Sequence, residues 1–303
     1  MEDLGLSQAV VNLLTRAISF CLPLLVGGCG FLPEWFLPAE KISRLQTNDA
    51  LQSNLKDKKE TISDKLKELN QQAPRLIEPV DALIEPISLN NLSKCKSIIG
   101  AREEVNAFAD SSNYGERLSE DAWGRSIVGS PQLIVLHETV LGEMETVNLF
   151  KTQHLRDQDQ ASYHLLVSRD GSLLRIVPDS KRAFGAGMSA FGDVTQRTKQ
   201  GSVGSINNIA LHIGLVSPDD GRDDRHSHSG YSDFQYKSLA KQILLWQARY
   251  GIPLTRVTSH AFVDRSHSRY DPRSFRWDKF DSFYKVFATR CSLQSLDNGL
   301  ASL

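Results

Sequence analysis

The stretch Leu133-Ile-Val-Leu-His-Glu-Thr139 decides the fold of this chain. Its first four residues form a continuous apolar run, which is typical of a strand whose two faces are both covered. The run ends at His137, where the pattern changes to that of a loop. We therefore expect a strand in the middle of a sheet, with a histidine at its carboxyl end.

A hairpin is predicted next along the chain. Its two strands would be Tyr163-His-Leu-Leu-Val-Ser168 and Leu173-Leu-Arg-Ile-Val177. Between them, Arg169-Asp-Gly171 supplies a glycine for the positive φ that a tight turn requires.

One more strand and a long helix complete the pattern. The apolar run from Ile209 to Val216 predicts the strand. Residues 232–250 carry apolar side chains at helical spacing, begin with the capping residue Ser232 and stop at Gly251-Ile-Pro253. Short strands followed by this helix predict an α/β fold.

The whole-chain composition is that of a globular protein, with 40% hydrophobic and 23% charged residues among 303. Lys and Arg number 35 against 36 Asp and Glu, so a net charge of −1 gives no electrostatic case for nucleic acid as a partner. The four cysteines contain no CxxC pair, so other residues must hold any metal.

The first 29 residues are typical of an export signal. Residues 17–28 form an apolar run that is shorter than the ~20 residues needed to span a bilayer. Val26-Gly-Gly-Cys29 resembles the lipobox of bacterial lipoproteins, in which Cys29 would be acylated and would anchor the protein to a membrane. We expect a protein of the periplasm or cell envelope. The alternative is an amphipathic or buried N-terminal helix in a cytoplasmic protein.

Three further segments are expected after the signal. Residues 30–90 combine leucines and isoleucines at roughly helical spacing with a proline-containing end, which indicates a helical spacer and linker. A globular domain would occupy residues 91–290, and residues 291–303 would form a C-terminal tail.

Three residues stand where a strand or helix pattern gives way to a loop: His137, His260 and Asp271. Taken singly, each has an ordinary explanation, because a histidine at a strand end is usually hydrogen-bonded and an aspartate before proline usually forms a turn. Together, two imidazoles and a carboxylate are a common catalytic zinc set that leaves one coordination position open.

The chain also resembles the type 2 N-acetylmuramoyl-L-alanine amidases, relatives of the peptidoglycan-recognition proteins. Five motifs carry the resemblance in the same order, Leu133-Ile-Val-Leu-His-Glu-Thr139, Ser162-Tyr-His-Leu-Leu-Val-Ser-Arg-Asp-Gly171, Ala183-Phe-Gly-Ala-Gly187, Thr258-Ser-His260 and Asp271-Pro-Arg-Ser-Phe-Arg-Trp277. The resemblance implies a central mixed β-sheet flanked by helices, here preceded by an N-terminal helical segment. It also implies a Zn²⁺ ion in a groove that binds peptidoglycan or muropeptide, where the enzyme cuts the amide between N-acetylmuramic acid and L-alanine.

Carried over position by position, the resemblance makes His137, His260 and Asp271 the zinc ligands. Tyr163 matches a tyrosine that orients water or the scissile carbonyl, although it can also be an aromatic packing residue. Arg269 takes the place of a lysine that stabilises the oxyanion in several members, with a bulkier, forked cation. His164 is interpreted as structural, because the two-residue period of a strand points it away from Tyr163.

One departure from the family puts catalysis in question. Many members carry a glutamate that serves as general base, and here alignment places Gly214 or Val216 at that position. Phage-type members lack it and still hydrolyse. A catalytically silent peptidoglycan-binding module therefore stays open, as does a zinc hydrolase of other amides. His212 shares the strand face of Gly214 and can either transfer protons or pack in the core.

The surrounding loops and cysteines carry weaker expectations. Residues 264–267 lie between two of the ligands, so they either line the groove or form a solvated loop. Residues 221–230 contain two histidines and are interpreted as a mobile surface loop over the site, open to adventitious metal. Cys95 and Cys291 flank the domain and could pair in an oxidising periplasm.

Overall fold

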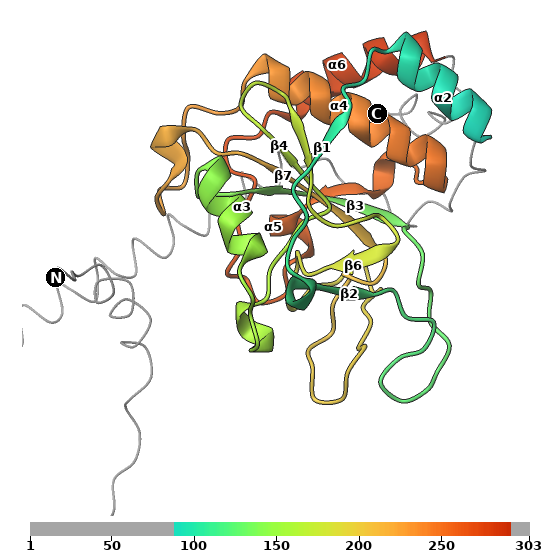
Figure 1. Ribbon diagram of the computed structural model, residues 1–303, viewed down its shortest axis with the longest axis vertical. Helices are drawn as coiled ribbons and strands as arrows, with labels where there is room; N and C mark the ends of the chain where they lie inside the picture. The colour runs from blue at the N-terminus through green and yellow to red at the C-terminus, as the bar shows by residue number, and fades with distance from the viewer. Residues whose placement is uncertain (1–87, 292–303) are drawn as a thin grey trace, which may run out of the picture. The chain divides into compact units, whose positions relative to one another are not determined.

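Six strands form one mixed sheet in the order β1-β5-β4-β7-β3-β8 (Figure 1). A computed structural model describes residues 88–291, which all belong to the second of the two units of the chain, residues 75–303. The strands are β1 Glu104–Asn106, β3 Leu133–Glu138, β4 Leu165–Val167, β5 Leu173–Arg175, β7 Ala210–Leu215 and β8 Val257–Ser259. Every neighbouring pair is parallel except β4 and β5, which form the predicted hairpin. A second, two-stranded sheet pairs β2 (Tyr114–Glu116) with β6 (Lys181–Ala183).

Helices cover both faces of the large sheet. They are α2 Leu89–Ile98, α3 Glu143–Lys151, α4 Asp233–Tyr250, α5 His260–Val263 and α6 Trp277–Arg290, with single 3₁₀ turns at η2 Ser111–Asn113, η3 Asp157–Asp159, η4 Asp219–Gly221 and η5 Leu254–Arg256. Figure 1 shows α2, α4 and α6 gathered on one side of the sheet, with α3 and α5 away from them. The expected mixed sheet flanked by helices is therefore confirmed.

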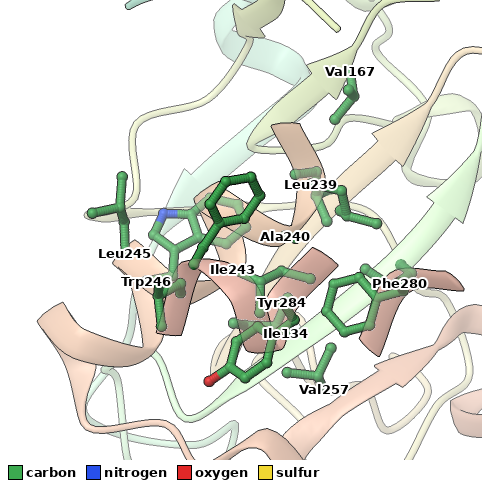
Figure 2. Close-up of a cluster of buried hydrophobic side chains, with 14 of the residues drawn as sticks. Ile134, Val167, Leu239, Ala240, Ile243, Leu245, Trp246, Val257, Phe280 and Tyr284 are labelled. Atoms are coloured by element: carbon green, nitrogen blue, oxygen red, sulfur yellow. The ribbon is translucent and has the colours of Figure 1, made fainter. Parts of the chain in front are cut away.

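The main core lies between the sheet and the α4–α6 layer. Side chains of alternate strand residues, including Ile134 and Val167, meet helix residues such as Leu239, Trp246 and Tyr284 (Figure 2). The other alternate residues of β3 and β7 face the opposite way and join a separate apolar cluster with Val263 of α5. The central strands are thus buried on both faces, as the unbroken apolar run of β3 predicts.

The long helix and the hairpin turn form for the local reasons that the sequence suggests. At the start of α4, Ser232 accepts a hydrogen bond from the backbone amide of Gln235, whose side chain caps Ser232 in return. Gly251 ends the helix at φ 67°. In the hairpin, Gly171 has φ 81°, and a Cβ atom there would lie 2.7 Å from the carbonyl oxygen of Phe234. Both predictions are confirmed.

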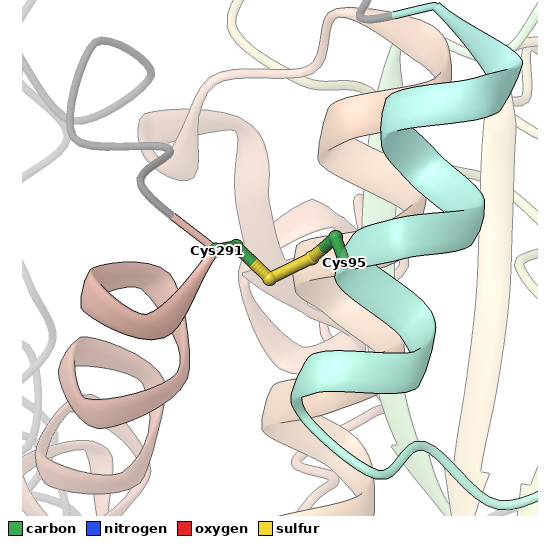
Figure 3. Close-up of a disulfide and its surroundings, with 2 residues drawn as sticks. All are labelled: Cys95 and Cys291. Atoms are coloured by element: carbon green, nitrogen blue, oxygen red, sulfur yellow. A yellow bond between two sulfur atoms is a disulfide. The ribbon is translucent and has the colours of Figure 1, made fainter.

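A disulfide between Cys95 and Cys291 joins α2 to the end of α6 (Figure 3). The two cysteines are 196 residues apart in sequence, and Cys95 is buried. The pairing considered from the sequence is therefore confirmed. The disulfide links two helices of the layer that also contains α4.

The predictions for the signal peptide, for Cys29, for most of the spacer and for residues 292–303 lie outside the described residues. Within residues 88–291, no helix combines the length and apolar character that a membrane crossing requires.

Candidate metal centre

The three candidate ligands come from adjacent parts of the sheet edge. His137 lies in β3, one residue before its end, and not in the loop beyond as the sequence suggested. His260 directly follows β8 and begins α5. Strands β3 and β8 are parallel neighbours, with Leu136 opposite Ser259, so their carboxyl ends meet at the same edge. Asp271 reaches this edge from the loop before α6, and its carbonyl oxygen accepts a hydrogen bond from the amide of Ala261.

The side chains of His137, His260 and Asp271 converge. One ligand atom from each lies within 4.8 Å of the others. Nδ1 of His260 is 2.9 Å from Oδ1 of Asp271, and Nδ1 of His137 is 3.4 Å from Oδ2. The structure thus brings together three residues from three separate segments of the sequence.

The chemistry of these atoms fits a divalent metal. Nδ1 of His137 is buried and makes no hydrogen bond, although it faces the Asp271 carboxylate oxygen Oδ2 at 3.4 Å. Burial lowers the pKa of His137 to about 4, so the imidazole is neutral at pH 7. Burial raises the pKa of Asp271, but its contacts with His137 and His260 outweigh that effect and hold the pKa below its usual value. Neutral imidazoles and an ionised carboxylate are the forms that bind zinc.

Tyr163 lies directly against the candidate ligand His137. Its ring stacks on that of His137 at 4.4 Å between centroids, and Phe150 of α3 packs edge-on against it at 5.4 Å. The Tyr163 hydroxyl is 3.4 Å from the carbonyl oxygen of Glu138. Burial raises the pKa of Tyr163 well above its usual value, so the hydroxyl keeps its proton at neutral pH and can donate a hydrogen bond.

The loop between His260 and Asp271 is organised by a buried carboxylate. Asp264 accepts hydrogen bonds from the backbone amides of Ser266, Ser268 and Arg269. Its side chain is therefore structural, while residues 265–267 are exposed. Arg269 is also exposed, and its backbone is fixed by the hydrogen bond to Asp264, two residues before Asp271 in the sequence. A catalytic role for Arg269 stays a prediction.

The position of the missing glutamate is filled by an aromatic ring. Gly214 of β7 lies opposite His137 in the parallel register, and the ring of Tyr163 packs against its backbone. Val216 is buried just beyond β7. Neither position can carry a proton, as the sequence indicates, and the ring leaves no room for a side chain at Gly214.

His212 is a site residue whose role the sequence left open. It lies two residues before Gly214 on the same face of β7, is fully buried, and has Nδ1 2.9 Å from Nε2 of His137. This contact involves the nitrogen of His137 that faces away from Asp271. His164 is buried too, and its ring nitrogens bind the backbone amide of His212 and the carbonyl of Lys181, which agrees with a structural role.

The loop of residues 221–230 is tied to the protein interior by a buried ion pair. Arg273 binds the carboxylate of Glu138, and its guanidinium also donates to the carbonyl oxygens of Gly221, Asp223 and Arg225. A buried guanidinium needs such partners for all of its N–H groups.

The expectation of a mobile surface loop is wrong at His228. Its side chain is fully buried, and Nε2 lies 3.1 Å from Glu138, which also accepts a 2.7 Å hydrogen bond from the Tyr231 hydroxyl. His228 is thus unavailable for adventitious metal. The sequence pattern was misleading because glycines, serines and charges dominate this segment, while its anchor, Arg273, lies far along the chain.

Comparisons with known proteins agree with the resemblance seen in the sequence. Residues 128–274 match the sequence model of a family described as N-acetylmuramoyl-L-alanine amidase. No curated protein gave a significant match. Similar solved structures include a selenomethionine derivative of AmpD, at 23% identity and a TM-score of 0.44 over 61% of this chain and 96% of that one. The amidase AmiD from E. coli, in complex with anhydro-N-acetylmuramic acid-L-Ala-D-gamma-Glu-L-Lys, gives 20% identity, a TM-score of 0.41 and coverage of 52% and 60%. AMPDH3 from Pseudomonas aeruginosa, in complex with anhydromuramic pentapeptide, is 20% identical, with a TM-score of 0.39 over 60% of this chain and 66% of that one.

Proposed function

Because the domain that contains residues 128–274 belongs to the type 2 N-acetylmuramoyl-L-alanine amidase family, we propose that this protein is a zinc-dependent hydrolase of peptidoglycan. The bond cut is the amide between N-acetylmuramic acid and L-alanine. The substrate is peptidoglycan or a muropeptide released from it.

The observation that carries this proposal is the convergence of His137, His260 and Asp271. Two imidazoles and one carboxylate would leave one coordination position of a zinc ion open, as catalytic zinc sites require. The unpartnered Nδ1 of His137 supports a metal over a purely structural cluster, because a buried nitrogen without a partner destabilises the fold unless something binds it.

Each side chain has a distinct task in this proposal. His137, His260 and Asp271 would hold the ion. A bound zinc ion supplies Lewis acidity toward the carbonyl oxygen and lowers the pKa of water toward ~7. Tyr163 donates its hydroxyl proton in a hydrogen bond to the oxyanion, since its raised pKa keeps the proton in place. Arg269 contributes positive charge from the loop that Asp264 orders.

A silent wall-binding module is the second candidate, and one observation favours it. No acidic side chain occupies Gly214 or Val216, so the usual general base of the family is missing. The family fold and the ligand cluster would both persist in such a descendant. Turnover, not metal binding, separates the two candidates.

We also propose that the protein is exported to the cell envelope. The Cys95–Cys291 disulfide supports an oxidising compartment, and peptidoglycan lies outside the cytoplasm. Anchoring through Cys29 would show as loss of the protein from the membrane fraction in a Cys29→Ser variant. An unchanged distribution would exclude this anchor.

The proposal is tested by digesting purified cell wall with the full chain and analysing the products by mass spectrometry. An amidase releases stem peptides with a free L-alanine amino group, a chelator stops the release, and added zinc restores it. A silent module sediments with the wall and releases nothing. A zinc hydrolase of other amides turns over a model amide and leaves the wall intact.

A further inference from the structure

His212 lies in the second layer of the candidate metal centre. It belongs to β7, the neighbour of β3, and shares a sheet face with Gly214, the residue opposite His137. Side chains two residues apart on a strand point the same way, so His212 faces the layer that contains the three ligand candidates. His212 is fully buried, so its imidazole is surrounded by protein.

The contact between His212 and His137 is a direct hydrogen bond. Nδ1 of His212 lies 2.9 Å from Nε2 of His137. The opposite nitrogen of His137, Nδ1, faces Asp271 and has no hydrogen-bond partner. Nε2 of His137 is therefore held by His212, while Nδ1 points toward Asp271.

The proton positions in this pair follow from the ligand role of His137. A metal held by His137 would take the lone pair of Nδ1, so a neutral His137 would carry its proton on Nε2. That proton can be donated only to an acceptor, so Nδ1 of His212 must be unprotonated. His212 then carries its own proton on Nε2, an atom that is buried and unpartnered.

The orientation of His212 is fixed by its neighbours. Its backbone amide donates to Nδ1 of His164, and the two rings lie 5.9 Å apart between centroids at an angle of 10°. Gly185 also packs so closely that a Cβ atom there would lie 2.5 Å from Nδ1 of His212. The ring therefore has no space to rotate away from His137.

An unpartnered Nε2 carries a stability cost that an apolar residue would avoid. Leucine or phenylalanine at position 212 would suit the apolar side chains that share its sheet face, Val135 and Ala210 among them. The presence of a histidine therefore requires a benefit elsewhere, and the hydrogen bond to His137 supplies it.

We propose that His212 is a positioning residue for the metal, which fixes the tautomer and the ring orientation of His137 by accepting the hydrogen bond from its Nε2. Outer hydrogen-bond partners of ligating histidines act this way in metal sites, and they also raise the basicity of the ligand. The inference rests on the proposed metal site. The proposal gives His212 no part in proton transfer with the substrate, because His212 contacts the nitrogen of His137 that faces away from Asp271.

The test is zinc affinity of the full chain, measured by competition with a chromophoric chelator. His212→Leu removes the acceptor, and His212→Asn restores an acceptor oxygen near the place of Nδ1. Gln247→Leu in α4 is the matched loss of a buried polar side chain that, like His212, has one hydrogen-bonded and one unpartnered atom. We expect a Kd for zinc about 10- to 100-fold higher in His212→Leu. His212→Asn should recover most of this loss, and Gln247→Leu should leave the Kd close to that of the wild-type protein.

Two results would overturn the inference. One is an unchanged Kd in His212→Leu, and the other is an asparagine variant that binds zinc no better than the leucine variant. Failure of the wild-type protein to bind zinc would instead contradict the proposed function, so the two failures are distinguishable.

A second measurement needs no variant, in case His212→Leu does not fold. In the zinc-loaded wild-type protein with ¹⁵N-labelled histidine, NMR correlations between ring nitrogens and ring protons report each tautomer. We expect the proton of His212 on Nε2 and that of His137 on Nε2. A proton on Nδ1 of His212 would contradict the assignment, because that nitrogen could then no longer accept.

Discussion

A Cβ atom on Gly214 would lie 2.6 Å from Cδ2 of Tyr163. The backbone of β7 and the ring of Tyr163 therefore meet without room for a methyl group between them. Since the same ring stacks on His137, a side chain at position 214 would shift Tyr163 relative to this candidate ligand.

Replacing Gly214 with alanine should separate catalysis from metal binding. The added methyl group displaces the Tyr163 ring, and misplacement of a catalytic group by about 1 Å costs on the order of 100-fold in rate. Zinc content should stay stoichiometric, because Gly214 holds no ligand. Gly187→Ala is the matched control, as a Cβ atom there would meet nothing within 4 Å. Equal turnover in the two alanine variants would contradict this account of Gly214.

Replacing Arg269 with alanine should lower kcat while zinc remains bound. Loss of one oxyanion-stabilising group costs about 2.7–4 kcal/mol in transition-state stability, or roughly 100-fold or more in rate. Arg269→Lys should retain part of the rate, because the positive charge remains. Arg265→Ala, an exposed cation on the same loop, serves as the control in steady-state assays with a muropeptide. A rate for Arg269→Ala equal to that of the control would remove Arg269 from the mechanism.

Asp264 should make the fold sensitive to acid in a defined range. Burial alone would raise the pKa of Asp264. Four hydrogen bonds from Ser266, Ser268 and Arg269 outweigh this effect and lower the pKa to about 2. The unfolded value is about 3.9, so the stabilisation is fully present above pH ~4 and is lost as the pH falls toward 2.

The comparison variant is Asp264→Asn. It should reduce the free energy of unfolding at pH 7 by about 2 kcal/mol, and the difference from wild type should shrink between about pH 4 and pH 2. Urea unfolding at several pH values measures this difference, with Asp193→Asn as an exposed control. A difference that does not change with pH would show that these hydrogen bonds do not lower the pKa of Asp264.

Reducing the Cys95–Cys291 disulfide should lower stability without releasing metal. A crosslink that closes a long loop contributes about 2–5 kcal/mol to the free energy of unfolding. The bond joins α2 to α6 on the layer opposite the metal centre, so zinc content should be unaffected. Urea unfolding with and without reductant tests this, and the Cys95→Ser/Cys291→Ser variant should show no response to reductant. Loss of zinc on reduction would contradict the independence of the two layers.

Local sequence patterns predicted the elements around the site, because each depends on neighbouring residues. The apolar run of β3 needs two covered faces, and Ser232 with Gln235 caps α4 within one turn. The ligand set followed from residue types at element ends together with the family resemblance. The family assignment is confirmed, while the roles of the single residues remain predictions.

Contacts between distant segments could not be predicted in the same way. The bond from His212 to His137 depends on the register between β7 and β3, which a single sequence does not specify. The anchoring of His228 depends on a buried pair between Glu138 and Arg273, and each of these residues alone resembles an ordinary surface charge. Burial of charge is decided by tertiary structure, so composition predicted exposure where the fold enforces burial.

The central claim is that His137 holds a catalytic metal, and it is tested most directly by measuring bound zinc and muropeptide hydrolysis together in two variants. His137→Ala should lose zinc and turnover at once, because a ligand is removed. Tyr163→Phe should keep zinc and lose about 2.7–4 kcal/mol of transition-state stabilisation, because only a hydrogen-bond donor is removed. Stoichiometric zinc in purified His137→Ala, with hydrolysis at the wild-type rate, would contradict the account.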